Sequence, residues 1–172
     1  MEVKEAIHKR RSIRRYRGDK ISLKLIYNLL KEANLAPSAG NLQARDFIIV
    51  DDNDLKYKLA EAAYNQNFIT EAPIIIVVCA NFNRIKPYGR RGFELYCLQD
   101  SAAAIDHILL LAIDQGLGTC WIGAFNENMV SQILGLPEYI RPIALIPIGH
   151  PAEKPEPPPR IPIEQLIHHN HW

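Results

Sequence analysis

The chain has 172 residues, of which 48% are hydrophobic, and a formal net charge of +1 at pH 7. A chain of ~150 residues buries roughly two-thirds of its unfolded surface, so this composition favours a single folded domain over residues 1–172. The near-zero net charge excludes a protein that binds polyanions with its whole surface, because the basic residues are concentrated only locally.

Three cysteines, Cys79, Cys97 and Cys120, lie far apart in apolar stretches. Neither a CxxC zinc spacing nor an even disulfide framework is present, so we expect a reduced, cytoplasmic protein with buried thiols and no metal. The N-terminus has no continuous apolar segment of the signal-peptide type. The longest apolar run, residues 74–80, is too short to cross a bilayer, so no membrane partner is expected.

The first half of the chain alternates between helical and extended patterns. A short amphipathic run predicts a helix over residues 3–10. Ser22 is a suitable N-cap for a second helix, in which apolar residues recur at helical spacing as far as Ala33. Residues 37–41 are rich in Pro, Ser, Gly and Asn, so they predict a loop. Residues 46–50 predict a strand.

The middle of the chain holds the two most apolar segments. Residues 51–54 offer capping side chains to a helix over residues 55–63. Residues 74–80 are apolar at every position and rich in β-branched side chains, which predicts a central strand covered on both faces. Residues 95–115 form the longest helical pattern and are apolar nearly all round. Such a helix is buried, either within one core or across a subunit interface.

The last third of the chain predicts shorter elements and an extended end. Residues 116–118 end the long helix, residues 119–122 predict a short strand, and residues 127–134 a helix. Residues 142–149 predict the last strand. Six prolines over residues 151–162 exclude a helix or an inner strand, so they predict a stiff arm that lies on a partner subunit. Long helices with few strands indicate an α+β or α/β domain, with one sheet layer covered by helices.

The most distinctive charge cluster is the arginine segment, residues 10–15, with four arginines and one serine. Arginine donates two parallel hydrogen bonds to a phosphate oxyanion and serine adds a third, so the segment indicates a pocket for a phosphate or a similar anion. A basic, solvated helix end is the alternative that charge alone leaves open. A second basic patch consists of Lys86, Arg90 and Arg91. It either binds the phosphates of a nicotinamide donor or is simply a solvated loop.

Several short motifs occur in a characteristic order along almost the whole chain. They are the arginine segment, residues 37–43, Glu71-Ala72-Pro73, Gln99-Asp100, residues 116–123 and residues 147–151. In this order and spacing the chain resembles the nitroreductase family of FMN-dependent, homodimeric oxidoreductases. The resemblance implies a nitroreductase-like α+β fold, with a central mixed β-sheet flanked by helices and a C-terminal arm and tail (residues 151–172) that reaches the partner subunit.

The resemblance also assigns cofactor-binding roles. The residues that it assigns to the flavin from one subunit are Arg10, Arg11, Ser12, Arg14, Asn65, Ile122, Gly123 and Arg160. Those that the neighbouring subunit would contribute are Ser38, Asn41 and Gln43, because the family's flavin lies in the dimer interface.

Within this set the implied roles differ. Arg10, Arg11 and Ser12 would hold the phosphate and ribityl end, and Arg160 would add a second phosphate contact. Arg14 would stand near the pyrimidine edge of the ring, where a fixed cation favours the reduced flavin. Asn65 would contact the flavin and Ile122 would lie behind its ring.

The Gly123 amide would lie near flavin N5, where glycine adds no bulk. No side chain is required as a catalytic acid, because the flavin carries the chemistry. Asp100 is therefore expected to pair within the helix packing.

The implied activity is hydride transfer from NADH or NADPH, through flavin N5, to a nitroaromatic, a quinone or a similar small electron acceptor. The alternatives are a flavin-binding sensor or store without turnover, and a family member that fragments flavin or removes halogen reductively. A nucleic-acid-binding module is disfavoured because the basic residues lack interleaved aromatics.

Two departures from the family pattern bear on these expectations. Ala44-Arg45 stands where relatives often carry Pro-Trp. The segment between Ala80 and Phe93 is short, which leaves the flavin face more open and the substrate class undetermined.

Overall fold

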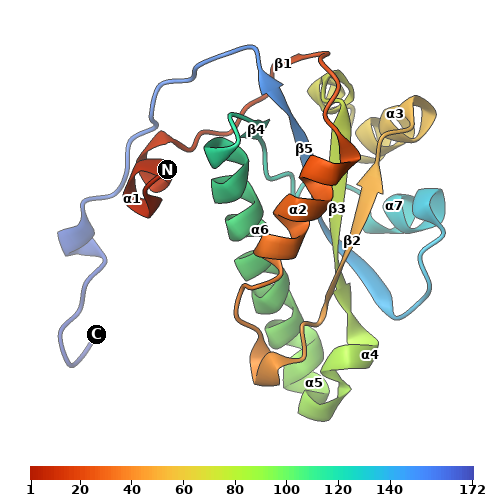
Figure 1. The fold of residues 1–172 in the computed structure, drawn as a ribbon. Helices are drawn as coiled ribbons and strands as arrows, with labels where there is room; N and C mark the ends of the chain where they lie inside the picture. The colour runs from red at the N-terminus through yellow and green to blue at the C-terminus, as the bar shows by residue number, and fades with distance from the viewer.

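An antiparallel sheet lies between two layers of helices in the computed structural model, which describes residues 1–172 (Figure 1). The strands are β1 (Tyr16–Arg17), β2 (Arg45–Val50), β3 (Ile74–Asn81), β4 (Gly118–Thr119) and β5 (Ile140–Pro151). The helices are α1 (Val3–Lys9), α2 (Leu23–Ala33), α3 (Asn53–Ala62), α4 (Phe82–Ile85), α5 (Gly89–Arg91), α6 (Cys97–Asp114) and α7 (Glu127–Leu134). The strand order is β1-β5-β3-β2, and β4 also pairs with β5.

The central strand β3 is buried at every position, as its unbroken apolar sequence predicts. Successive side chains of a strand point to opposite faces of the sheet. Ile76 and Val78 therefore pack with α2 and α6 in one hydrophobic cluster, whereas Ile75 and Val77 pack with α3 and α7 in the other. Each face of the sheet thus has its own core.

The named strand pairs are all antiparallel, which confirms the α+β class. The mixed character of the sheet rests on one isolated parallel bridge, between Ser12 and Thr119. The strand expected over residues 119–122 is wrong in extent, because β4 is only Gly118–Thr119. Ile122 instead forms an isolated bridge with Leu145, since the chain leaves the sheet between the two contacts.

Local capping side chains set the starts of the surface helices, as the sequence predicts. The Ser22 hydroxyl accepts a hydrogen bond from the Leu25 amide at 3.3 Å at the start of α2. The Asp52 carboxylate accepts one from the Leu55 amide at 2.8 Å at the start of α3. Such caps satisfy amides that the first turn of a helix leaves without partners.

The long helix predicted over residues 95–115 is preceded by further helical turns. The chain is helical from Phe82 onward, through α4, α5 and a π-helical turn (Gly92–Tyr96), before α6 begins. By length and composition the run Phe82–Asp114 could cross a membrane. Its apolar residues pack against the sheet and α2, and this packing accounts for its hydropathy.

The proline-rich arm is extended, as predicted, and largely exposed in the single chain. It leaves β5 beside the arginine segment, where the Ala152 amide donates to the Arg15 carbonyl at 2.9 Å. Figure 1 shows it passing α1 and ending away from the sheet. Its exposed large apolar side chains are Ile161, Ile163, Leu166, Ile167 and Trp172. That the arm reaches a partner subunit stays a prediction.

Candidate functional site

The arginine segment lies across the end of the sheet and is held there by its backbone. The Ile13 amide donates to the Thr119 carbonyl at 2.9 Å. The buried Tyr16 hydroxyl donates to the Ile13 carbonyl at 2.6 Å and to the Pro147 carbonyl at 3.2 Å. Burial raises the pKa of Tyr16, so its hydroxyl remains protonated as a donor.

Two carboxylates from distant parts of the chain complete this support. Glu71 accepts a hydrogen bond from the Tyr16 amide at 3.1 Å, which explains the glutamate of the Glu71-Ala72-Pro73 motif. Glu153, at the start of the arm, accepts one from the Arg14 amide. Glu153 was not predicted from the sequence, because its partner lies far away along the chain and no local pattern marks it.

Two cations of the segment have no protein partner. The guanidinium groups of Arg10 and Arg14 form no hydrogen bond or ion pair within the chain, and Arg14 lies 6.0 Å from the centre of the Phe68 ring. Burial raises the pKa of the Cys120 thiol, whereas the Arg14 and Arg10 charges and a hydrogen bond with Ser12 lower it. The backbone bridge between Ser12 and Thr119 places this serine next to the residue that precedes Cys120.

Arg11 combines a structural contact with an unsatisfied donor. Its Nη1 donates to the His8 carbonyl at 2.8 Å and to the Arg10 carbonyl at 2.7 Å, next to the C-terminal end of α1. Its Nε is buried and has no hydrogen-bond partner. Leaving a buried donor unsatisfied costs about 1–3 kcal/mol, so this atom fits an oxygen of a bound anion such as a phosphate.

The turn that carries Asn65 lies next to the Gly123 backbone. Gln66, which sequence analysis missed, donates through Nε2 to the Ala124 carbonyl at 3.0 Å. Tyr64 and Asn65 have φ angles of 58° and 61°. Non-glycine residues in this region are strained and cluster at functional sites.

Ile122 and Gly123 follow β4 on the same side of the molecule. Ile122 is buried and exchanges two backbone hydrogen bonds with Leu145, both of 3.0 Å. The Gly123 amide has no hydrogen-bond partner in the chain, and the space beside its Cα is open. Phe68 joins the Asn65 turn to the arginine segment, because it packs against Ile13 and lies under Arg14. The structure thus brings these predicted residues together.

A second set of predicted residues forms the Ser38 loop, residues 38–43. The Gln43 amide donates to the Ser38 hydroxyl at 3.1 Å, and its side-chain amide donates to the Asn41 carbonyl at 3.0 Å. The φ angles of Asn41 and Gln43 are 56° and 49°. Three polar side chains are therefore held in one strained loop.

The Ser38 loop lies at the opposite end of α6 from the arginine segment (Figure 1). Asp100 in the first turn of α6 accepts a hydrogen bond from the Ala39 amide at 2.8 Å, which confirms its expected pairing role. β4, which holds the arginine segment, follows the other end of the helix. At 1.5 Å per residue, Asp100 and Asp114 are about 21 Å apart, too far for one small ligand in one chain to touch both sets.

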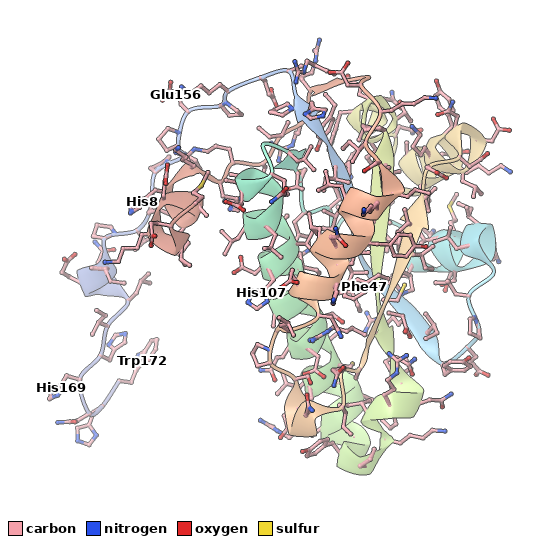
Figure 2. All side chains as sticks on the ribbon, viewed as in Figure 1. His8, Phe47, His107, Glu156, His169 and Trp172 are labelled. Atoms are coloured by element: carbon pink, nitrogen blue, oxygen red, sulfur yellow. The ribbon has the colours of Figure 1, made fainter.

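Arg160 is not brought to the arginine segment within one chain. Its guanidinium donates back to the Pro158 and Pro159 carbonyls, at 3.2 and 3.1 Å. Figure 2 shows the arm between Glu156 and Trp172 running past His8 and away from the sheet.

Gly118 permits the close approach that fixes the arginine segment. A Cβ at this position would lie 2.7 Å from Cγ1 of Ile13. We expect Gly118→Ala to lower the free energy of unfolding by about 1–3 kcal/mol, as overpacking does, in chemical denaturation. Gly18→Ala, where an added Cβ meets nothing within 4 Å, should change it by less than about 1 kcal/mol. Equal stabilities would contradict this packing argument.

Comparisons with known proteins find relatives that align over nearly the whole chain. The chain is 32% identical to the NADH dehydrogenase of Thermus thermophilus, over 97% of this chain and 95% of that protein. It is 32% identical to the FMN reductase [NAD(P)H] of Bacillus subtilis, over 97% of this chain and 73% of that protein. Among solved structures, NfrA2 of B. megaterium matches with a TM-score of 0.93 and 30% identity, over 100% of this chain and 76% of that one.

The family comparison covers most of the chain. The sequence profile described as "Nitroreductase family" matches residues 7–68 and 61–150, which include every predicted cofactor-binding residue except Arg160. Two relatives above 30% identity also align over nearly the whole chain, so the profile match and the relatives identify the same family. The protein belongs to the nitroreductase family.

Proposed function

We propose that the protein is an FMN-dependent oxidoreductase that takes hydride from NADH or NADPH and reduces a nitroaromatic, a quinone or a similar small acceptor. The oxidoreductase class, FMN and the NAD(P)H donor follow from family membership and from relatives named FMN reductase [NAD(P)H] and NADPH-flavin oxidoreductase. The observation that carries the proposal in this chain is the buried, unpartnered Arg11 Nε, together with an Arg10 guanidinium that has no hydrogen-bond or ion-pair partner.

The phosphate end of FMN is assigned to Arg10, Arg11 and Ser12, with Arg160 of the arm as a further cation. A phosphate is a permanent anion, so arginines that stay protonated suit it better than groups that titrate near neutrality. The backbone contacts of Ile13 and Tyr16 fix these side chains in place before binding, which reduces the ordering cost of binding.

The ring end is assigned to Arg14, Asn65, Ile122 and Gly123. When bound, FMN supplies the hydride chemistry, so the chain's own task is to bind, orient and tune it. The Arg14 guanidinium would offset negative charge at the pyrimidine edge, and the Gly123 amide would donate a hydrogen bond toward N5. The open space beside Gly123 leaves room for the flavin ring to approach its amide.

We further propose a homodimer in which Ser38, Asn41 and Gln43 complete the flavin site of the partner subunit. The separation of the Ser38 loop from the arginine segment along α6 supports this arrangement. The arm supports it too, because Ile163 and Ile167 are more than half exposed in one chain. Exposed apolar side chains in such a row are typical of a surface that a partner covers.

The protein is proposed to be one cytoplasmic domain spanning residues 1–172. Both hydrophobic clusters pack on one sheet, which supports a single domain. The three cysteines are free and buried, which supports a reducing compartment. Burial raises the pKa of Cys79 to about 12, so this thiol is expected to be unreactive.

Colour and bleaching test the proposed function. The purified protein should be yellow, with flavin absorbance that bleaches under anaerobic NADH or NADPH and returns when a quinone or nitroaromatic is added. A colourless protein that binds no added FMN would contradict the proposal. A yellow protein that neither donor bleaches would favour a flavin sensor or store. Steady-state kinetics with a panel of donors and acceptors would then identify the preferred pair.

A further inference from the structure

Arg45 is a buried arginine whose contacts the proposed function does not use. Arg45 lies at the start of β2 and is only 2% exposed. Nε donates to the Asn34 Oδ1 at 3.2 Å, and Nη2 to the Asn34 and Ala36 carbonyls, both at 2.8 Å. Nη1 donates to the Pro37 carbonyl at 3.3 Å and to the Asp100 carbonyl at 3.0 Å.

These contacts engage all five N–H donors of the guanidinium, and four of the five acceptors are backbone carbonyls. The group is therefore used to fix the course of the chain and forms no ion pair. Burial lowers the pKa of Arg45, whereas the Asp100 charge raises it. A buried charge that is fully hydrogen-bonded in this way is costly to disturb, because removing it leaves carbonyls unsatisfied.

Asp100 holds the same stretch of chain from the other side. Its Oδ1 accepts from the Ala39 amide at 2.8 Å and its Oδ2 from the Ala44 amide at 3.4 Å. Arg45 fixes the approach to the Ser38 loop through Ala36 and Pro37, and it binds the Asp100 carbonyl as well. Both ends of the strained loop are thus attached to the first turn of α6.

We propose that Arg45 is a positioning residue for FMN: with Asp100, it holds the Ser38 loop in the conformation that completes the flavin site of the partner subunit. The proposal rests on the proposed function. Positive φ angles at Asn41 and Gln43 persist only where surrounding contacts impose them. Arg45 contributes by fixing the residues that lead into the loop, through the carbonyls of Asn34, Ala36 and Pro37. Lysine cannot replace it, because an ammonium has three donors around one nitrogen.

Arg84 also supports the Ser38 loop, from the solvent side, but its role is not equivalent to that of Arg45. It donates to the Gln43 carbonyl at 3.2 Å and the Arg45 carbonyl at 2.6 Å, and it pairs with Asp46 at 2.8 Å. Its side chain is 44% exposed, so water can replace these contacts. The buried Arg45 is therefore the residue whose loss the loop cannot compensate.

The first test compares Arg45→Lys with wild type by amide hydrogen exchange and by FMN binding to the flavin-free protein. We expect the Ala39 and Ala44 amides to exchange at least about tenfold faster while β3 amides are unchanged, and FMN to bind about tenfold more weakly. Asp100→Asn should weaken FMN binding similarly. Arg141→Lys, which removes the bidentate geometry of an ion pair with Glu127 outside the loop, is the matched control. Unchanged exchange at Ala39 and Ala44, or unchanged FMN affinity in Arg45→Lys, would overturn the proposal.

The second test is a mixed dimer of one Arg45→Lys chain and one Arg10→Ala chain, isolated with two affinity tags. If the loop acts on the partner's site, one site carries both defects and the other is intact, so half of the sites should bind FMN with wild-type affinity. Two weakened sites and none intact would overturn the proposal. A wild-type protein that binds no FMN would contradict the proposed function itself. Normal wild-type binding with two weakened sites would leave FMN binding standing but would contradict the claim that the loop acts on the partner's site.

Discussion

Arg10→Ala is expected to weaken FMN binding about 10- to 100-fold. The Arg10 guanidinium has no partner within the chain, so its hydrogen-bonding capacity is available to the phosphate. A hydrogen bond that involves a charged group contributes about 1.5–3 kcal/mol, and each 1.4 kcal/mol corresponds to a factor of ten in affinity. Because no protein contact is lost, the free energy of unfolding should change by no more than about 0.5 kcal/mol.

The measurement is titration of the flavin-free protein with FMN, followed by quenching of flavin fluorescence. Arg15→Ala is the matched control, because it removes the same charge from a side chain that is 72% exposed and lies 3.8 Å from Glu71. Its effect should be small and should fade with added salt, as screening predicts. Equal losses in the two variants would mean that the segment acts only through its overall charge, and the assignment of Arg10 to the phosphate would be wrong.

The fold was predictable where neighbouring residues determine structure. The apolar run over residues 74–80 predicts a central strand because only a strand covered on both faces accommodates such a sequence. The caps at Ser22 and Asp52 were predictable because a capping side chain binds an amide three residues away. The strand predicted over residues 119–122 is too long, because its pairing with β5 is interrupted between Thr119 and Ile122, which no local pattern records.

The candidate site was predictable mainly through the order of its motifs. The cations of the arginine segment stand out in the sequence because four of them occur within six positions. Their supports stand out less. Glu153 binds the Arg14 amide from a distant part of the chain, and no motif includes it. Glu71 belongs to a motif, but its contact with the Tyr16 amide was not predicted. Arg45 is a similar case. Its place in the sequence indicates a polar side chain near a loop, but it does not indicate that this side chain is buried against Asp100. Such contacts follow from packing, so only the folded chain reveals them.

Removal of residues 156–172 is expected to produce a single-chain protein that no longer retains FMN. The arm carries Arg160 and the exposed apolar residues Ile161, Ile163, Leu166 and Ile167. Burying four such side chains against a partner would contribute roughly 6–12 kcal/mol before the cost of ordering the arm. Without the partner, each site also lacks Ser38, Asn41 and Gln43, so FMN affinity should fall by more than about 100-fold.

Light scattering gives the mass of each form, which should be twice the chain mass of 19.6 kDa for the full chain and that of one chain for the shortened one. A chain that ends at Ile167 is the control, because it lacks only the histidine-rich tail and keeps every apolar residue of the arm except Trp172. The arm adds nothing to either hydrophobic cluster, so the shortened chain should keep its secondary structure. A shortened chain that remains a dimer and holds FMN would show that the interface does not need the arm, and the role of the arm would be wrong.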